Sequence, residues 1–143
     1  SDDDATAKAM KALQGEWKGI ETEENGGGKL PKDRVKLQNR RIIIMGNSLS
    51  MSRVIINVQK LGTYVGKFEI DASKGHFDFV GKGPDGKVTE WTGIYELEGD
   101  ILKLCFIYQK DGKAKRPNSF KTRAPVEPGM HHVFYTFMRD IDK

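Results

Sequence analysis

The sequence has few of the residues that build covalent or metal-bound frameworks: one cysteine and three histidines among 143 residues. A single cysteine cannot form an intramolecular disulfide framework, and no spacing of cysteine and histidine resembles a structural zinc site. Long apolar runs are also missing, because the longest stretch, near Ile42–Met45, is far shorter than the roughly 20 residues of a membrane-spanning helix. These absences exclude disulfide-rich, zinc-stabilised and helical membrane-spanning folds.

The overall composition is typical of one soluble domain. Hydrophobic residues make up 37% and charged residues 31% of the chain, which argues against a disordered or collagen-like protein. At this length a second domain would leave each half with a small core, so we expect a single domain. The 16 glycines predict many tight turns.

One short amphipathic helix is predicted, over Asp2–Leu13. Its alanines favour helix, its aspartates suit the positive end of the helix dipole, and Gly15 can end it in a left-handed conformation. Its apolar residues fall on one face, so the helix needs a partner. We expect residues 1–14 to close one end of a β domain formed by residues 15–143.

From Gly15 onward, short β segments are separated by turn residues. Glu98–Asp100 is the clearest tight hairpin, and Leu30–Gln38 is ambiguous because Pro31 could begin a short helical turn. Strands and helices do not alternate, which argues against a nucleotide-binding α/β fold. About eight antiparallel strands favour a sandwich or a barrel. The predicted strands are Glu16–Glu24, Arg40–Met45, Ser48–Val58, Gly62–Ile70, His76–Val80, Val88–Leu97, Ile101–Tyr108 and Met130–Arg139.

Alternation along these strands indicates which side chains face inward. In Ile101–Tyr108, for example, Leu102, Leu104 and Phe106 share one face. Eight strands that close on themselves leave an interior that side chains fill or that holds one small ligand. The aromatic residues predicted to line such an interior are Trp91, Tyr95, Phe106 and Tyr135.

The start and the end of the β region carry a family resemblance. Gly15-Glu16-Trp17, directly after the helix, resembles the Gly-x-Trp signature of the lipocalin/calycin superfamily. In that superfamily an arginine at the end of the last strand packs across the tryptophan ring, and Arg139 stands at the matching position. A guanidinium over an indole gains about 0.5–2 kcal/mol. The resemblance implies an up-and-down β-barrel in which Gly15, Trp17 and Arg139 are structural.

A second resemblance is more specific. Gly93–Phe106 reads GIYELEGDILKLCF and is followed by Lys115-Arg116-Pro117 and Phe120, similar to a bacterial lipocalin-like domain family of uncharacterised function. Its members read roughly GIYEL-x-GD-x-LK-x-C and then RP-x-x-F. The likeness spans about Leu13 to Arg139, although the proline that often follows an upstream Asp turn is replaced here by Gly75-His76-Phe77. The family implies an exported, periplasmic or extracellular protein.

No residues assemble into a catalytic or metal-ligating pattern in the sequence. His131 and His132 are adjacent on a strand and must point to opposite faces, whereas His76 and Asp78 share a face but lack a third ligand. Cys105 is interpreted as a buried, packed side chain rather than a nucleophile, because no histidine lies in its local motif. We therefore expect a non-catalytic protein with no cofactor and no metal.

A basic stretch follows the predicted hairpin. Residues 103–123 contain seven lysines and arginines against one acidic residue, which predicts either a solvated loop or a surface for an anionic partner. The stretch has few aromatic residues, so it is a weak match for a nucleic-acid-binding surface. Arg116 is predicted to pair with Asp100 or Glu96. The residues proposed for an anionic-partner surface within Lys110–Arg123 are Lys113, Lys115, Arg116, Lys121 and Arg123.

Two functions follow from these patterns. The first is non-catalytic binding of a small, mostly apolar ligand inside a lipocalin-like barrel, because such interiors are concave and apolar. The second is a cell-envelope interaction or structural domain that uses the basic stretch to bind an anionic partner. We expect a monomer with no specific nucleic-acid partner.

Overall fold

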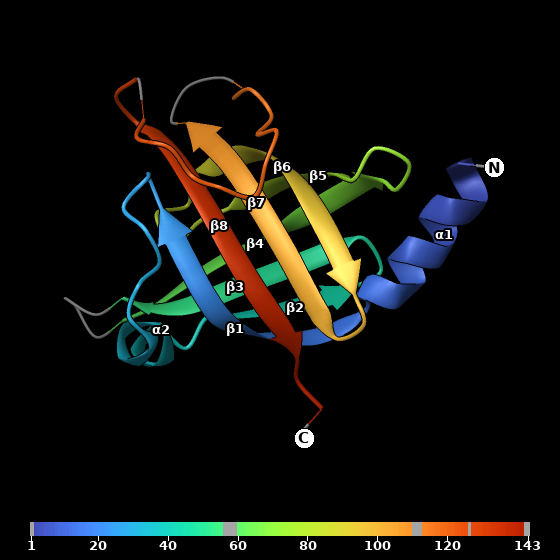
Figure 1. Ribbon diagram of the computed structural model, residues 1–143, viewed down its shortest axis with the longest axis horizontal. Coiled ribbons are helices and arrows are strands. Elements are labelled where there is room, and N and C mark those ends of the chain that lie inside the picture. Colours follow the sequence, from blue (N-terminus) through green and yellow to red (C-terminus); the bar gives the residue numbers. More distant parts are fainter. Residues whose placement is uncertain (1, 56–59, 110–112, 126, 142–143) are drawn as a thin grey trace.

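Turn residues divide the β region into short strands that close into a barrel in the computed structural model, which describes residues 2–55, 60–109, 113–125 and 127–141 (Figure 1). Gly46, Gly75 and Gly99 have positive φ angles and allow tight turns between consecutive strands. The described elements are α1 (Asp2–Leu13), β1 (Gly15–Glu24), α2 (Lys32–Gln38), β2 (Arg41–Met45), β3 (Ser48–Ile55), β4 (Lys60–Asp71), β5 (His76–Lys82), β6 (Val88–Glu98), β7 (Ile101–Gln109) and β8 (Met130–Arg139).

Each strand pairs with its neighbours in the sequence, and β1 pairs with β8 to close the barrel. All eight pairings are antiparallel among the described residues. The predicted antiparallel β-barrel with a short N-terminal helix is therefore confirmed, and the architecture is compatible with a lipocalin-like fold. In the described part of the chain, the helices are too short and too polar to cross a membrane.

The predicted elements differ from the structure mainly at their ends. The ambiguous segment after Pro31 forms α2, which Asn39 ends in a left-handed conformation. β4 and β5 extend beyond the predicted ends, to Asp71 and Lys82, because backbone pairing continues past the last apolar residue. The predicted end of the third strand, residues 56–58, lies outside the described residues.

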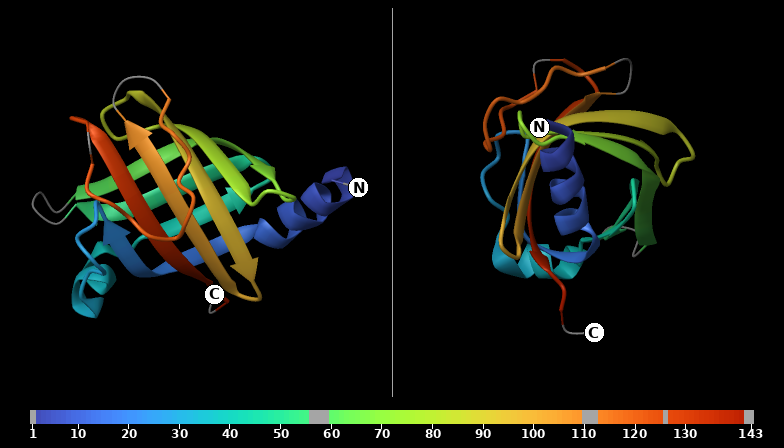
Figure 2. Two further views of the ribbon diagram at one scale, coloured as in Figure 1. Left: turned by 45° about the horizontal axis from the view of Figure 1, so that its top comes forward. Right: turned by 90° about the vertical axis from the view of Figure 1, so that its right-hand side faces the viewer.

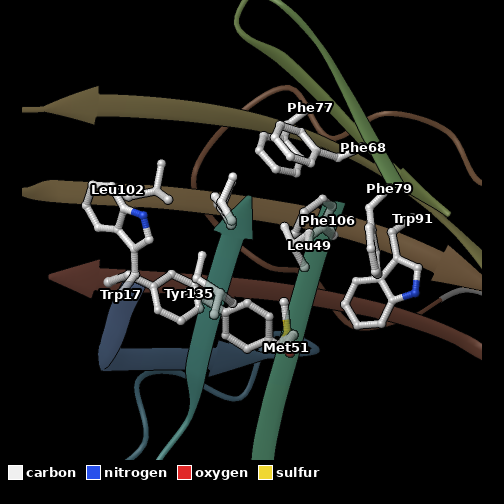
Figure 3. Packing of buried hydrophobic residues seen from close by; sticks show 14 of the residues in the cluster. Trp17, Leu49, Met51, Phe68, Phe77, Phe79, Trp91, Leu102, Phe106 and Tyr135 are labelled. Atoms are coloured by element: carbon white, nitrogen blue, oxygen red, sulfur yellow. The ribbon is translucent and has the colours of Figure 1, made fainter. Parts of the chain in front are cut away.

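Aromatic side chains fill the middle of the barrel (Figure 3). Phe68 and Phe77 stack with their ring centroids 4.8 Å apart, and Phe106 meets Phe77 edge-on at 5.7 Å. Gly93 makes this packing possible, since a Cβ atom there would come within 2.5 Å of the Phe106 ring. The interior residues that alternation predicts are thus mostly used to contact one another.

The two ends of the barrel differ, and Figure 2 shows α1 in front of one of them. At this α1 end, Leu13 and Trp17 are fully buried, and the Trp17 indole N–H donates to the Leu13 carbonyl at 3.0 Å. The Arg139 guanidinium lies 4.2 Å from the centre of the Trp17 ring, which is the contact that the Gly-x-Trp resemblance implies. We call the opposite end, which carries α2, the connection 83–87 and the described segments 113–125 and 127–129 between β7 and β8, the loop end.

Candidate functional site

Many of the inward-facing positions at the loop end are occupied by polar and aromatic side chains. Glu24 of β1 and Tyr135 of β8 face the same side as the buried Val133, because Glu24 pairs with Val133 in the sheet. Arg40 precedes the inward-facing Ile42 by two residues, so it faces inward too. We call these residues, with others from β1, β3, β4, β6 and β7, the loop-end cluster: Thr22, Glu24, Arg40, Arg53, Tyr64, Trp91, Tyr108 and Tyr135.

Trp91 is the centre of the aromatic half of this cluster. Its ring stacks on Tyr108 with centroids 4.1 Å apart and meets the edge of Tyr64 at 5.1 Å. Tyr108 in turn stacks on His131 at 5.0 Å. The Tyr64 ring lies over Gly83, where a Cβ atom would come within 2.6 Å of it. Trp91 is 2% exposed, yet its indole N–H has no hydrogen-bond partner among the described residues.

Arg40 is one of three charged residues in the cluster, with Glu24 and Arg53. The Gly19 N–H donates to the Arg40 carbonyl at 2.8 Å, which fixes the backbone at the start of β2. The guanidinium lies 4.2 Å from the centre of the Tyr135 ring, and its Nη1 is 3.9 Å from the sulfur of Met51. Only 4% of the side chain is exposed. Its Nε and Nη2 nevertheless make no hydrogen bond within the described residues.

The charges around Arg40 do not balance. Its nearest carboxylate, that of the half-buried Glu24, lies 4.0 Å from Nη2, which is beyond hydrogen-bonding distance. Burial raises the pKa of Tyr135, and the charges of Arg40 and Arg53 lower it while Glu24 raises it. Two guanidinium groups and one carboxylate therefore act on the same buried hydroxyl.

The tyrosines of the cluster remain hydrogen-bond donors at neutral pH. Burial raises the pKa of Tyr64, Tyr108 and Tyr135 above the ordinary value of 10.0. A phenol that stays protonated can donate its O–H to an incoming acceptor. Next to Tyr108, a surface hollow of about 420 Å³ opens between the turn at Asp85 and the start of β8 at His131.

The four predicted lining residues are not all brought together. Trp91 and Tyr135 belong to the loop-end cluster. Phe106 lies in the middle of the barrel, fully buried against Phe77. Tyr95 is half-buried near the α1 end and borders a hollow between α1 and β6. Sequence reasoning missed Arg40, although a charged residue two positions before Ile42 on the inward face was a signal that could have identified it.

The outer wall of β5 and β6 holds a second arrangement, which corrects the predicted partner of Arg116. Its guanidinium donates to both carboxylate oxygens of Asp78, at 2.6 and 3.0 Å, and to the Gly93 carbonyl at 2.7 Å. The prediction of Asp100 or Glu96 was wrong, because the segment after β7 folds back across β6 and carries Arg116 to β5. Asp100 pairs with Arg139, and Glu96 pairs with Lys103.

This ion pair keeps Asp78 ionised. It also uses the carboxylate that, with His76 on the same face of the strand, would otherwise be available to a metal ion. Burial alone would raise the pKa of Asp78, but the hydrogen bonds and the charge of Arg116 outweigh burial and lower it. Among the described residues, no group of three histidine, cysteine, aspartate or glutamate side chains could hold a metal ion.

The predicted anionic-partner surface lies where the 113–125 segment crosses the outer face of β7 and β8 (Figure 2). Lys113, Lys115, Lys121 and Arg123 are exposed there, whereas Arg116 is held by its ion pair. A hollow of about 310 Å³ lies beside Lys115, Lys121 and Arg123, with His132 at its wall. Lys110, where the predicted surface begins, lies outside the described residues.

Cys105 and His132 meet beneath this segment, but their geometry does not make a nucleophile. The Cys105 sulfur lies 3.5 Å from Nε2 of His132, while Nδ1 of His132 accepts the Arg123 N–H at 3.0 Å. An Nδ1 that accepts leaves the proton of the neutral ring on Nε2, so the imidazole cannot take the thiol proton there. Burial, and secondarily the Glu23 charge, raise the pKa of Cys105 to about 12.

The loop-end cluster thus combines buried donors with an incompletely paired charge, and a surface hollow reaches one of its members, Tyr108. Its arrangement suits the binding of a molecule that supplies acceptors and apolar surface, and it contains no geometry for covalent catalysis among the residues described above. Compared with protein-family models, curated proteins and solved structures, the chain has no match in any of the three.

Proposed function

We propose that this protein binds a small, mostly apolar molecule at the loop end of its barrel, without catalysis. The observation that carries the proposal is the pair of buried groups, the Arg40 guanidinium and the Trp91 indole, whose N–H donors lack partners among the described residues. More than about nine in ten buried polar groups in native structures have a hydrogen-bond partner. Thr22 Oγ1 and Gln38 Oε1 are also buried without a partner among the described residues, so four residues with such atoms lie at one end of the barrel, which favours a ligand that completes some of them.

The physical argument is the free energy of desolvation. A buried donor without a partner costs about 1–3 kcal/mol, and a charged one costs more. Natural proteins retain such groups mainly at sites where function requires them. The aromatic rings of Trp91 and Tyr108 add apolar surface beside these donors, which is the usual composition of a small-molecule site.

We propose further that the chain belongs to the bacterial lipocalin-like domain family of uncharacterised function, and that it is exported. The support is the closed eight-stranded barrel, the Arg139–Trp17 stacking contact and the GIYELEGDILKLCF motif over β6 and β7. In this motif, Gly93 leaves room for Phe106, and Asp100 binds Arg139. Both positions therefore have structural reasons to carry the residues that they do.

Titration with the neutral fluorescent probe N-phenyl-1-naphthylamine tests the binding function. We expect saturable binding that quenches or shifts tryptophan fluorescence. The Tyr108→Ala variant should bind the probe with about tenfold lower affinity, because a stacked ring is removed. Tyr95→Ala is the matched control: it removes the same side chain from the α1 half of the barrel and should leave the affinity unchanged. Absence of saturable binding, or loss of binding only in Tyr95→Ala, would contradict a loop-end site.

A second candidate function is recognition of an anionic macromolecular surface by the 113–125 segment. It is favoured by the exposed Lys115, Lys121 and Arg123 around one hollow. Sedimentation with phosphatidylglycerol vesicles should then fall steeply with added salt and disappear when these residues are changed to glutamine. Probe binding at the loop end should not respond to the same changes.

A further inference from the structure

We infer that the ligand of the loop-end site is an amphipathic anion, whose carboxylate or sulfonate group binds Arg40 while its apolar body lies against Trp91 and Tyr108. This inference rests on the binding function proposed above and assigns the chemical class of the ligand. Three observations support it: the missing hydrogen-bond acceptors of Arg40, the donors and positive charge of its neighbours, and the hydrogen bonds of Arg139 in a similar setting.

Arg40 requires an acceptor that the described residues do not supply. Arginine carries five N–H donors and no acceptor. Of the contacts described for Arg40, the Met51 sulfur is a weak acceptor and the Glu24 carboxylate lies 4.0 Å from Nη2. A buried charge of this kind is stable only when it is paired and hydrogen-bonded.

The groups around Arg40 are those that favour an anion over a neutral or cationic ligand. Arg53 adds a second positive charge that acts on Tyr64, Tyr108 and Tyr135. Protonated phenols and the unpaired Trp91 N–H are donors as well. A cation would meet two arginines and only one carboxylate, that of Glu24, and a neutral ligand would leave Arg40 with this carboxylate at 4.0 Å as its only charged partner among the contacts described.

Arg139 shows what a completed arrangement of the same kind looks like in this chain. Its guanidinium also lies 4.2 Å from an aromatic ring centre, and it donates to the Asp100 carboxylate and to the carbonyls of Ala12 and Gln14 at 2.8–3.0 Å. A carboxylate at Arg40 would fill the place that Asp100 fills at Arg139. Two planar oxygens suit the guanidinium because both donors can bind in parallel.

The experiment compares two probes with the same aromatic body. 1-Anilinonaphthalene-8-sulfonate carries an anionic group, and N-phenyl-1-naphthylamine lacks it. We expect wild-type protein to bind the sulfonate about tenfold more tightly, which corresponds to one charge-assisted contact. Decanoate should displace the sulfonate better than decanol does, which extends the comparison to a carboxylate on an aliphatic chain.

Variants then locate the preference. Arg40→Met should remove the difference between the two probes, while Glu24→Gln should widen it because the competing carboxylate is gone. Arg139→Met is the matched control at the α1 end, and a Lys115→Gln/Lys121→Gln variant controls for anion binding at the outer surface. Both controls should keep the wild-type preference. Urea unfolding of each variant shows whether it is folded, and Glu24→Gln decides the question if Arg40→Met does not fold.

The outcomes separate the two proposals. Equal affinity for both probes, with Tyr108→Ala weakening both, would overturn the anionic ligand and leave the binding function standing. No saturable binding of either probe would overturn both. A preference that disappears in the Lys115/Lys121 variant and persists in Arg40→Met would move the anion to the outer surface and overturn the assignment to Arg40.

Discussion

The two ends of the barrel use the same pair of side chains in opposite ways. At the α1 end, Trp17 donates its N–H to Leu13 and Arg139 makes three hydrogen bonds while it covers the indole. At the loop end, Trp91 is almost as buried as Trp17, and the Arg40 side chain is 4% exposed against 27% for Arg139. The Trp91 Nε1 and the Arg40 Nε and Nη2 nevertheless have no hydrogen-bond partner among the described residues. The α1 end thus has its donors paired within the chain, and the loop end has donors without a partner among the described residues.

This difference suggests a division between stability and function. The hydrogen bonds at the α1 end stabilise the fold, because each donor there exchanges a hydrogen bond to water for one to the protein. The unpaired donors at the loop end reduce stability, and proteins accept such losses at functional sites. The contrast can be tested because each end offers the same substitutions at one arginine and one tryptophan.

The largest expected effect separates the two arginines. Arg139→Met should lower the free energy of unfolding by about 1.5 kcal/mol, because it removes three charge-assisted hydrogen bonds and leaves the partly buried Gln14 carbonyl without its donor. Arg40→Met should change it by less than about 1 kcal/mol or raise it, because a buried, incompletely paired charge is replaced by an apolar side chain. Urea unfolding followed by circular dichroism measures both values.

Equal losses in the two arginine variants would break this comparison. They would mean that Arg40 stabilises the fold as Arg139 does, through partners beyond those described. Arg40→Lys and Arg139→Lys serve as controls, since they keep the charge and remove the planar guanidinium.

A smaller effect is expected from the two tryptophans. Trp17→Phe and Trp91→Phe remove comparable volume, but only Trp17→Phe leaves a buried carbonyl, that of Leu13, without its donor. Trp17→Phe should therefore be the more destabilising by about 1 kcal/mol. Thermal unfolding at several urea concentrations would show it. A larger loss in Trp91→Phe would indicate that packing, and not hydrogen bonding, distinguishes the ends.

The smallest effect on stability is expected for Arg116. Its ion pair lies on the outer wall of the barrel and can be compared with the arginines at the two ends. Its pair with Asp78 is partly exposed, so Arg116→Gln should cost about 1 kcal/mol at neutral pH. The pKa of Asp78 is lowered below its ordinary value of 3.8, with the hydrogen bonds and charge of Arg116 outweighing the effect of burial. The stabilisation is therefore present above pH about 4 and is lost as the pH falls through the folded-state pKa.

Urea midpoints measured from neutral pH down to acid check this sign. The difference between wild type and Arg116→Gln should shrink on acidification. A difference that grew as the pH fell would contradict the assignment of Asp78 as the partner.

Local sequence patterns predicted the fold well and the site only in part. Gly15-x-Trp17, the Glu98–Asp100 turn and the alternation in β7 each depend on residues close in sequence, and each appears in the structure as expected. The partner of Arg116 could not be predicted in this way, because Asp78 lies 38 positions away and becomes a neighbour only when the segment after β7 folds back.

The turns and the alternating faces could be predicted from the sequence alone, because backbone conformation and side-chain direction are largely local, whereas the stacking of Arg139 on Trp17 was implied by the family resemblance. Only the tertiary structure decided which buried groups would find partners. Closing the barrel buries Arg40 almost completely and Arg139 in part, yet it brings acceptors to Arg139 and leaves Arg40 with a thioether and a carboxylate 4.0 Å away. The loss of water from a buried group depends on the packing of all strands together, so no short sequence motif predicts it.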